Sequence, residues 1–301
     1  METRWLEDFV SLAETGSFSK SAALRHVTQP AFSRRIKALE AWVGTDLIDR
    51  TSYPTKLTPA GKVFFEQALE MLGRVTELQH LLRGPRRPEA EIIDFALPHT
   101  LALTYFPGWL SRIARQFRPL KSRLRAENVH DAVLRLVEGG CDVVICYHHA
   151  EQPVQLDPAR YETRVLGDEG LFPYARAGRD GVPEFVLPGR ANQPIPFLAY
   201  SPNAYLSRMV DLALATSRGR VHLEKVFETD MAESLKAMAL EGHGLAFLPD
   251  SAVVTELKRK RLARAGERWG VTMEIRAYRE APSPARPAKP IVQALWEHLS
   301  R

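Results

Sequence analysis

The pattern of hydrophobic and polar positions over residues 17–44 predicts two short helices that meet at a tight turn. The first covers residues 19–26. The second has one apolar face, which is formed at intervals of three and four residues by Phe32, Ile36, Leu39 and Val43. Thr28 suits a helix N-cap, Pro30 is tolerated in a first helical turn, and Gly44 suits the position after the last turn. This pattern is typical of a helix-turn-helix.

The opposite face of the second helix is polar and basic, and this points to nucleic acid. It carries Pro30, Ser33, Arg34 and Lys37. No acidic residue lies between Lys20 and Lys37, so the surface attracts phosphates. The N-terminal half of such a helix fits a DNA major groove. The alternative interpretation is an ordinary solvated helical face.

Shorter apolar segments on both sides complete this first domain. Residues 2–15 are predicted to form an amphipathic supporting helix, with one side made by Trp5, Leu6, Phe9, Val10 and Ala13. After the second helix, apolar residues flank a polar turn, which is typical of a β wing. Arg50 and Lys56 in this region are placed to meet phosphates or a minor groove, unless they are solvated loop charges.

A long helix is predicted from Pro59 to about residue 83, and it carries a heptad-like apolar stripe. The stripe consists of Phe64, Ala68, Met71, Val75, Leu78 and Leu82. A single helix would expose these side chains, so we expect the helix to pair with its copy in a second subunit. Packing within the chain is the alternative, and we assign that role to the neighbouring face.

The second half of the chain alternates strands and helices, which predicts α/β lobes built on parallel sheets. Expected strands are 92–97, 122–126, 142–146, 197–200, 221–229, 245–248 and 271–278, and expected helices are 101–117, 131–138, 205–216, 231–241 and 291–299. We therefore divide the chain into a DNA-binding domain (1–58), a linker helix with hinge (59–88) and an effector domain (89–301). Crossovers near Leu166 and Gly270 separate lobe I (89–166 and 270–301) from lobe II (167–269).

Composition narrows the class of protein further. The chain has 301 residues and a net charge of +5, so the placement of its basic residues matters more than their excess. It has no apolar run of membrane-spanning length and no secretory leader, and its two cysteines are five residues apart in an expected strand. We expect a reduced, cytoplasmic protein without membrane contact. Common catalytic and nucleotide-binding motifs are missing, so we expect no enzyme activity and no cofactor.

Two-lobed α/β modules bind ligands at the carboxyl ends of their strands, and this rule names candidate effector residues. They are His99, Thr100, Asn128, Tyr147, His148, Ser201, Asn203, Thr229, Met231 and Phe247. Each has an ordinary structural alternative, such as capping a helix. His148 and His149 are adjacent in a strand and point in opposite directions, so we expect no metal site.

Two long motifs resemble the DNA-binding domain of LysR-type transcriptional regulators: FVSLAETGSFSKSAALRHVTQPAFSRRIKALE and LIDRTSYPTKLTPAG. The segments EGGCDVVI and EGHGLAFLPDSA are similar to the effector domain of that family. The resemblance implies an all-α winged helix-turn-helix with a long coiled-coil linker helix, followed by an α/β two-lobed domain like a type II periplasmic binding protein. It places an effector between the lobes, on Thr100, Tyr147, Ser201 and Phe247.

The same resemblance implies a homo-oligomer, dimer or tetramer, that binds double-stranded DNA and acts with RNA polymerase. Bases would be read by Gln29, Pro30, Ser33 and Arg34 beside Thr28, and phosphates would be held by Arg35, Lys37, Arg50 and Lys56. A solute-binding protein and an enzyme on the α/β lobes are the competing functions.

Four further segments look similar to the hypochlorite-responsive, HypT-like subfamily, which is switched by methionine oxidation: METRWLEDFVSL, ENVHDAVLRLVEGGCDVVICYHH, YSPNAYLSR and TDMAESLKAMALEGHGLAFLPD. Oxidation makes an apolar thioether polar. Met231 and Met209 are the redox candidates, and Leu206 departs from the subfamily, which carries Met there. The alternatives are that these methionines fill the core, and that the signal is a small anionic metabolite between the lobes.

Overall fold

The computed structural model describes residues 2–51, 55–82, 91–202, 204–217, 219–284 and 286–300. The chain divides into two compact units, one formed by Met1–Arg86 and the other chiefly by Arg87–Leu136 and Gly140–Arg301. The expected hinge at 84–88 lies outside the described residues. No helix in the described ranges is both long and apolar enough to cross a membrane.

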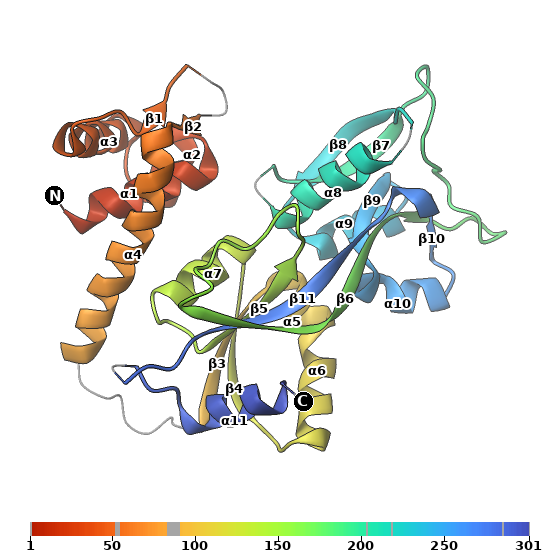
Figure 1. The fold of residues 1–301 in the computed structure, drawn as a ribbon. Helices are drawn as coiled ribbons and strands as arrows, with labels where there is room; N and C mark the ends of the chain where they lie inside the picture. Colours follow the sequence, from red (N-terminus) through yellow and green to blue (C-terminus); the bar gives the residue numbers. More distant parts are fainter. Residues whose placement is uncertain are drawn as a thin grey trace. The chain divides into compact units, whose positions relative to one another are not determined.

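The N-terminal unit is a helical domain with a small β ribbon (Figure 1). Its elements are α1 (Thr3–Thr15), α2 (Phe18–Leu24), α3 (Gln29–Val43), β1 (Ile48–Asp49), β2 (Lys56–Leu57) and α4 (Pro59–Leu82). The two strands are antiparallel, with Ile48 opposite Leu57. Gly16 and Gly44 end α1 and α3 in the left-handed conformation, which glycine adopts without strain.

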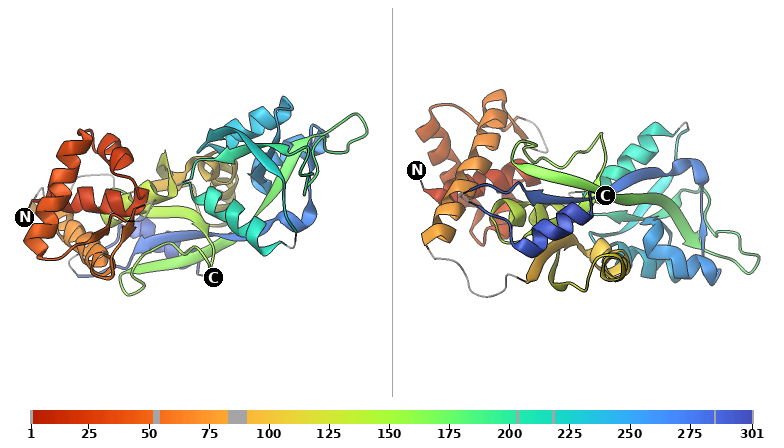
Figure 2. Two further views of the ribbon diagram at one scale, coloured as in Figure 1. Left: turned by 90° about the horizontal axis from the view of Figure 1, so that it is seen from above. Right: turned by 60° about the horizontal axis from the view of Figure 1, so that its bottom comes forward.

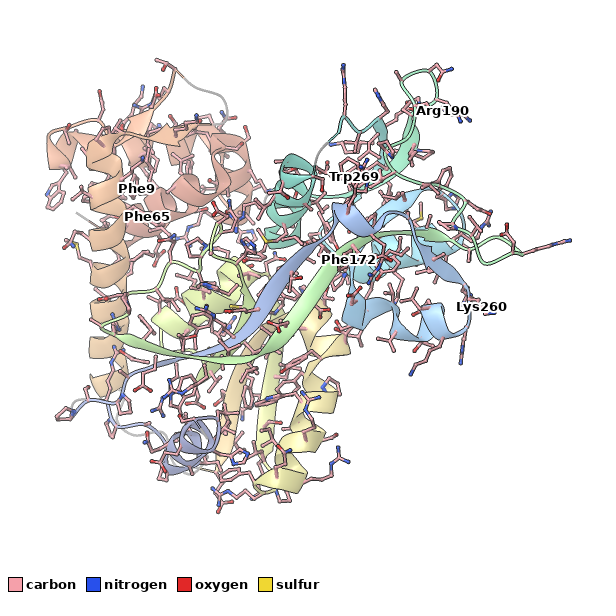
Figure 3. The ribbon with its side chains drawn as sticks, turned by 45° about the vertical axis from the view of Figure 1, so that its right-hand side comes forward. Phe9, Phe65, Phe172, Arg190, Lys260 and Trp269 are labelled. Atoms are coloured by element: carbon pink, nitrogen blue, oxygen red, sulfur yellow. The ribbon has the colours of Figure 1, made fainter. Side chains whose placement is uncertain are left out.

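The core of this unit joins α1, α3 and the first half of α4. Phe9 is fully buried and meets Phe64 edge to face, with 5.2 Å between ring centroids. Phe65 packs against the same cluster, and Figure 3 shows Phe9 and Phe65 in this unit. Ala68 is also fully buried here. Phe64 and Ala68 therefore pack within their own chain, which corrects their assignment to the intersubunit stripe, because the turn of α4 brings them onto α1.

The C-terminal unit is built on one mixed sheet, which has nine strands in the described residues. The order is β4-β3-β5-β11-β6-β9-β7-β8, and β10 pairs with β6. The strands are β3 (Ile92–Pro98), β4 (Lys121–Glu127), β5 (Val143–His148), β6 (Tyr161–Arg176), β7 (Ile195–Tyr200), β8 (Leu223–Thr229), β9 (Leu245–Pro249), β10 (Leu262–Arg264) and β11 (Val271–Glu280).

Helices α5 (His99–Thr104), α6 (Phe106–Gln116), α7 (Val129–Val137), α8 (Tyr205–Thr216), α9 (Ala232–Leu240), α10 (Asp250–Lys258) and α11 (Pro290–His298) pack around the sheet, with a 3₁₀ turn η1 (Glu267–Trp269). Figure 2 shows them on both sides of the strands.

Two long strands connect the halves of this unit. β6 and β11 run antiparallel and side by side through its middle, with a register irregularity between Ile275 and Arg276 (Figures 1 and 2). Parallel pairs flank them: β4, β3 and β5 on one side, and β9, β7 and β8 on the other. Gly270 precedes β11, and a Cβ there would lie 2.1 Å from the Phe172 ring, so a larger residue would have to displace this ring.

Several sequence expectations need correction. The sheet is mixed rather than parallel, because the crossovers are themselves strands that pair antiparallel. The pattern missed β6, whose alternation is interrupted by glycine, proline and charge, and it missed α10 and β10. Cys141 lies before β5, and it and Cys146 are both free thiols.

Candidate nucleic-acid interface and effector site

The helix-turn-helix is closed by local hydrogen bonds. Ser17 caps α2 by accepting a hydrogen bond from the Lys20 N–H at 3.4 Å. His26 adopts a positive φ of 53°, and the Val27 N–H reaches back to the Ala22 carbonyl at 2.9 Å. Thr28 occupies the N-cap position of α3, although its side chain makes no capping hydrogen bond. The turn between α2 and α3 is therefore tight and well supported.

Helix α3 is buried on one face and exposed on the other. Phe32, Ile36 and Leu39 are fully buried. The exposed face carries Thr28, Gln29, Pro30, Arg34 and Lys37, with Ser33 half-buried at its edge. The Ser19 hydroxyl donates to the Gln29 side-chain oxygen at 3.1 Å, which orients this amide at the start of the helix. The sequence-predicted base-reading residues thus lie together on one accessible surface.

A buried carboxylate holds two arginines behind this surface. Asp8 on α1 is fully buried and accepts hydrogen bonds from Arg25 at 2.9 Å and from Arg35 at 3.1 Å. Glu7 also contacts Arg25. Arg35 was predicted to hold phosphate, and the structure places its charge against Asp8. The sequence pattern missed Asp8, since an acidic residue in an amphipathic helix is normally solvent-exposed.

A second carboxylate organises the β ribbon. Glu40 is buried and accepts hydrogen bonds from the backbone N–H groups of Leu47 and Ile48, at 3.0 and 3.1 Å. The same carboxylate pairs with Arg50, the other predicted phosphate ligand. Glu40 therefore couples the end of α3 to the ribbon, while Lys56 on β2 remains exposed.

In the C-terminal unit, some predicted effector residues lie where the two halves of the sheet meet. Tyr147 near the end of β5, Thr100 at the start of α5 and Phe247 in β9 are buried. Tyr147 stacks on Tyr205 of α8, with centroids 6.2 Å apart and planes at 19°. Ser201 is half-buried, and its N–H donates to the Thr229 carbonyl at 2.9 Å.

Three further polar residues join Tyr147, and sequence reasoning did not select them. Burial raises the pKa of Tyr147 well above its usual value, and the charge of Glu169, the nearby Tyr200 and the charge of Glu233 raise it further. Glu169 on β6 accepts a hydrogen bond from the Ser251 N–H at 2.9 Å, and burial raises the pKa of its carboxyl. For Tyr200 the sequence did hold a signal, because Tyr200 is the last residue of β7, just as Tyr147 lies next to the last residue of β5.

The other predicted effector residues lie apart or serve structural roles. His99 and Asn128 are exposed, and Asn128 accepts the Ala132 N–H at the start of α7. His148 pairs through Nδ1 with the Tyr278 hydroxyl at 2.9 Å. Asn203 lies outside the described residues. The described side chains contain no group of three or more residues suited to hold a metal ion.

The methionine candidates differ in accessibility. Met231 precedes α9 and is 41 % exposed, whereas Met209 on α8 is fully buried. Leu206 is also buried in this core. An oxidant in solution therefore reaches Met231 before Met209.

A basic helix-turn-helix, linked to an α/β unit with buried polar groups at the junction of its halves, defines a transcriptional regulator with a sensory domain. Comparison with known families agrees. Residues 3–62 match the bacterial regulatory helix-turn-helix protein, lysR family, and residues 86–301 match the LysR substrate binding domain. The chain therefore belongs to the LysR family of transcriptional regulators.

Relatives of known name support this assignment. The Escherichia coli K12 HTH-type transcriptional regulator YjiE is 32% identical over 99% of this chain and 94% of its own length. Full-length HypT from Salmonella typhimurium, a hypochlorite-specific LysR-type regulator, is 31% identical with a TM-score of 0.57, over 99% of this chain and 97% of that one. Vibrio fischeri DarR in complex with DNA is 30% identical with a TM-score of 0.57, over 99% and 98%.

Proposed function

We propose that this LysR-type regulator binds its operator as a winged helix-turn-helix, with α3 in the major groove and the β1–β2 ribbon as the wing. The exposed polar face of α3, opposite its fully buried apolar face, carries this proposal. Arg34 and Lys37 make no ion pair with other described residues, so their charges are available to DNA. Arg35 and Arg50 contribute through guanidinium groups that carboxylates hold in place.

We further propose that α4 pairs with α4 of a second subunit, so that two recognition helices meet two half-sites. Met71 and Val75 are 37 % and 38 % exposed and form the accessible part of the predicted stripe. The side chains of Leu78 and Leu82 lie outside the described residues, and we retain them in the stripe. In this scheme residues 1–58 bind DNA, 59–88 pair and connect, and 89–301 sense the signal and act on RNA polymerase.

For the signal, we propose two alternative sites in the C-terminal unit. The first is the set of buried polar side chains around Tyr147, where a small molecule would be recognised. The second is Met231, whose exposure supports direct oxidation by hypochlorite or a similar oxidant. The HypT relative from Salmonella is named as hypochlorite-specific, which favours testing the oxidant.

The DNA-binding assignment is tested by Arg34→Ala in gel shifts on DNA upstream of the protein's own gene. A lost base contact costs about 1–3 kcal/mol, which is roughly a ten- to hundredfold weaker complex. Arg179→Ala, at an exposed position of the C-terminal unit, is the matched control and should leave the affinity unchanged. If Arg34→Ala binds this DNA with unaltered affinity, the proposed contact between α3 and the major groove is wrong.

A further inference from the structure

Three polar side chains from other elements, Glu169, Tyr200 and Glu233, act electrostatically on the buried Tyr147 hydroxyl of the C-terminal unit. Tyr147 comes from β5, Glu169 from the long strand β6, Tyr200 from the end of β7 and Glu233 from the first turn of α9. Tyr147 and Tyr200 are only 1 % and 4 % exposed. We call these four residues the junction cluster.

The hydrogen-bonding capacity of the junction cluster is unused at three atoms. The hydroxyls of Tyr147 and Tyr200 and Oε1 of Glu233 are buried and have no partner among the described residues. Buried polar groups are normally paired, since leaving one unpaired costs about 1–3 kcal/mol. The other oxygen of Glu233 pairs with Lys236 at 2.5 Å, and Lys236 also donates to the Ala252 carbonyl at 2.9 Å. The free oxygen of Glu233 is therefore available to a donor such as a ligand.

The charges around the cluster favour a donor over an anion. The charged groups that act on Tyr147 are Glu169 and Glu233, and the one that acts on Tyr200 is Glu233. Lys236, the cation beside them, is engaged by Glu233 and by a carbonyl. A bound anion would therefore lie near carboxylates in buried surroundings, where such repulsion is strong.

The aromatic surroundings also suit a cation. The Tyr147 ring of the cluster stacks on the Tyr205 ring, with 6.2 Å between their centroids. Faces of aromatic rings attract ammonium groups. Two tyrosine hydroxyls, a free carboxylate oxygen and neighbouring aromatic rings are groups that suit the recognition of an amine.

We propose that the junction cluster recognises a small ligand through a protonated amine, which donates to Glu233 and to the hydroxyls of Tyr147 and Tyr200. This inference rests on the proposed role of the C-terminal unit as a sensor, and it replaces the anionic metabolite with a cationic one. Contacts that bridge the halves lie close by: the Thr104 and Ser251 hydroxyls are 3.0 Å apart, and the Tyr205 hydroxyl donates to the Gln152 carbonyl at 3.1 Å. A ligand here would bias how the two halves meet.

Calorimetric titration and thermal unfolding of the full chain with methylammonium chloride test the proposal, against sodium chloride, sodium acetate and sodium bromide at equal ionic strength. Methylammonium is expected to bind and to raise Tm above the sodium chloride value, while acetate and bromide do not. Preference for either anion, or no difference between methylammonium and sodium chloride, would overturn the proposal.

Matched variants locate the site. Tyr200→Phe is expected to weaken methylammonium binding about tenfold, as the loss of one hydrogen bond predicts, and Glu233→Gln more strongly because the charge is lost. Tyr161→Phe is the control, because Tyr161 also has a buried, unpartnered hydroxyl but lies outside the cluster. Equal binding by all three variants and the parent would contradict the assignment.

Operator binding by the same samples separates the two levels. If the protein binds DNA specifically but does not bind methylammonium, the proposed ligand class is wrong and the proposed function as a DNA-binding regulator is retained. If specific DNA binding is absent, the proposed function itself fails.

Discussion

At the scale of single residues, two buried acidic side chains hold arginines of the DNA-binding unit in place. Asp8 and Glu40 are both buried, and each holds an arginine that a charge pattern alone would assign to phosphate. A carboxylate beside a guanidinium lowers the net charge offered to DNA while fixing where that charge lies. Arg34 and Lys37 are then the residues expected to dominate the salt dependence of binding.

Replacing Asp8 by Ala tests this organisation. The change leaves Arg25 and Arg35 without their shared partner, and breaking a fully buried pair costs about 3–5 kcal/mol. The arginine side chains are 32% and 28% exposed, so we expect about 2 kcal/mol here, seen as a lower Tm of the N-terminal unit in calorimetry.

The matched control is Glu2→Ala, because Glu2 pairs with Arg4 at an exposed position of the same unit. Its unfolding temperature should equal that of the parent. An Asp8→Ala protein as stable as the parent would show that the buried carboxylate contributes nothing to this fold.

At the scale of elements, α4 serves two partners along its length. Its first turns pack on α1 through Phe64 and Ala68, and its exposed apolar positions include Met71 and Val75. The sequence periodicity predicted the apolar stripe of α4. It could not separate the residues that pack on α1 from those proposed to face a second subunit, since both roles require apolar residues at similar spacing.

The double change Met71→Glu with Val75→Glu tests pairing through α4. It adds like charges across the proposed intersubunit seam, so sedimentation velocity should show a shift toward monomer with the helical content unchanged. Val186→Glu, at a position 52 % exposed in the C-terminal unit, is the control and should leave the oligomer intact. An unchanged sedimentation coefficient for the double variant would exclude this part of α4 from the interface.

At the scale of the whole molecule, the proposed function requires that a signal in the C-terminal unit alters DNA binding by the N-terminal unit. Such coupling is a difference in free energy between two states of the protein, and it requires a group that distinguishes them. Met231 offers one, because a sulfoxide at the start of α9 would place a polar oxygen two residues from Glu233.

Hypochlorite treatment tests this second signal. We expect sub-stoichiometric oxidant to form sulfoxide at Met231 before buried Met209, and to change the operator footprint. Mass spectrometry of the samples used for gel shifts measures both. Met231→Leu should abolish the response, whereas Met209→Leu should preserve it. If the operator footprint does not change after oxidant treatment, a ligand at the junction cluster remains as the proposed signal.

The candidate sites were only partly readable from the sequence, for reasons that individual residues illustrate. The α3 face was predictable because its chemistry lies within one helical period. Tyr200 was not selected although it ends β7, and Glu233 was not selected because nothing in its local sequence shows that it acts on Tyr147. His99 was selected by its place after a strand, and the structure leaves it exposed.

The sequence by itself determined the helix-turn-helix, the long helix after it and the alternating strands and helices of the second half. These depend on local periodicity, capping and turn residues, which act over a few positions. Only the tertiary structure decided that β6 and β11 pair antiparallel, that Asp8 and Glu40 are buried, and that the junction cluster exists. Each of these depends on contacts between residues far apart in the chain, for which one sequence carries no direct signal.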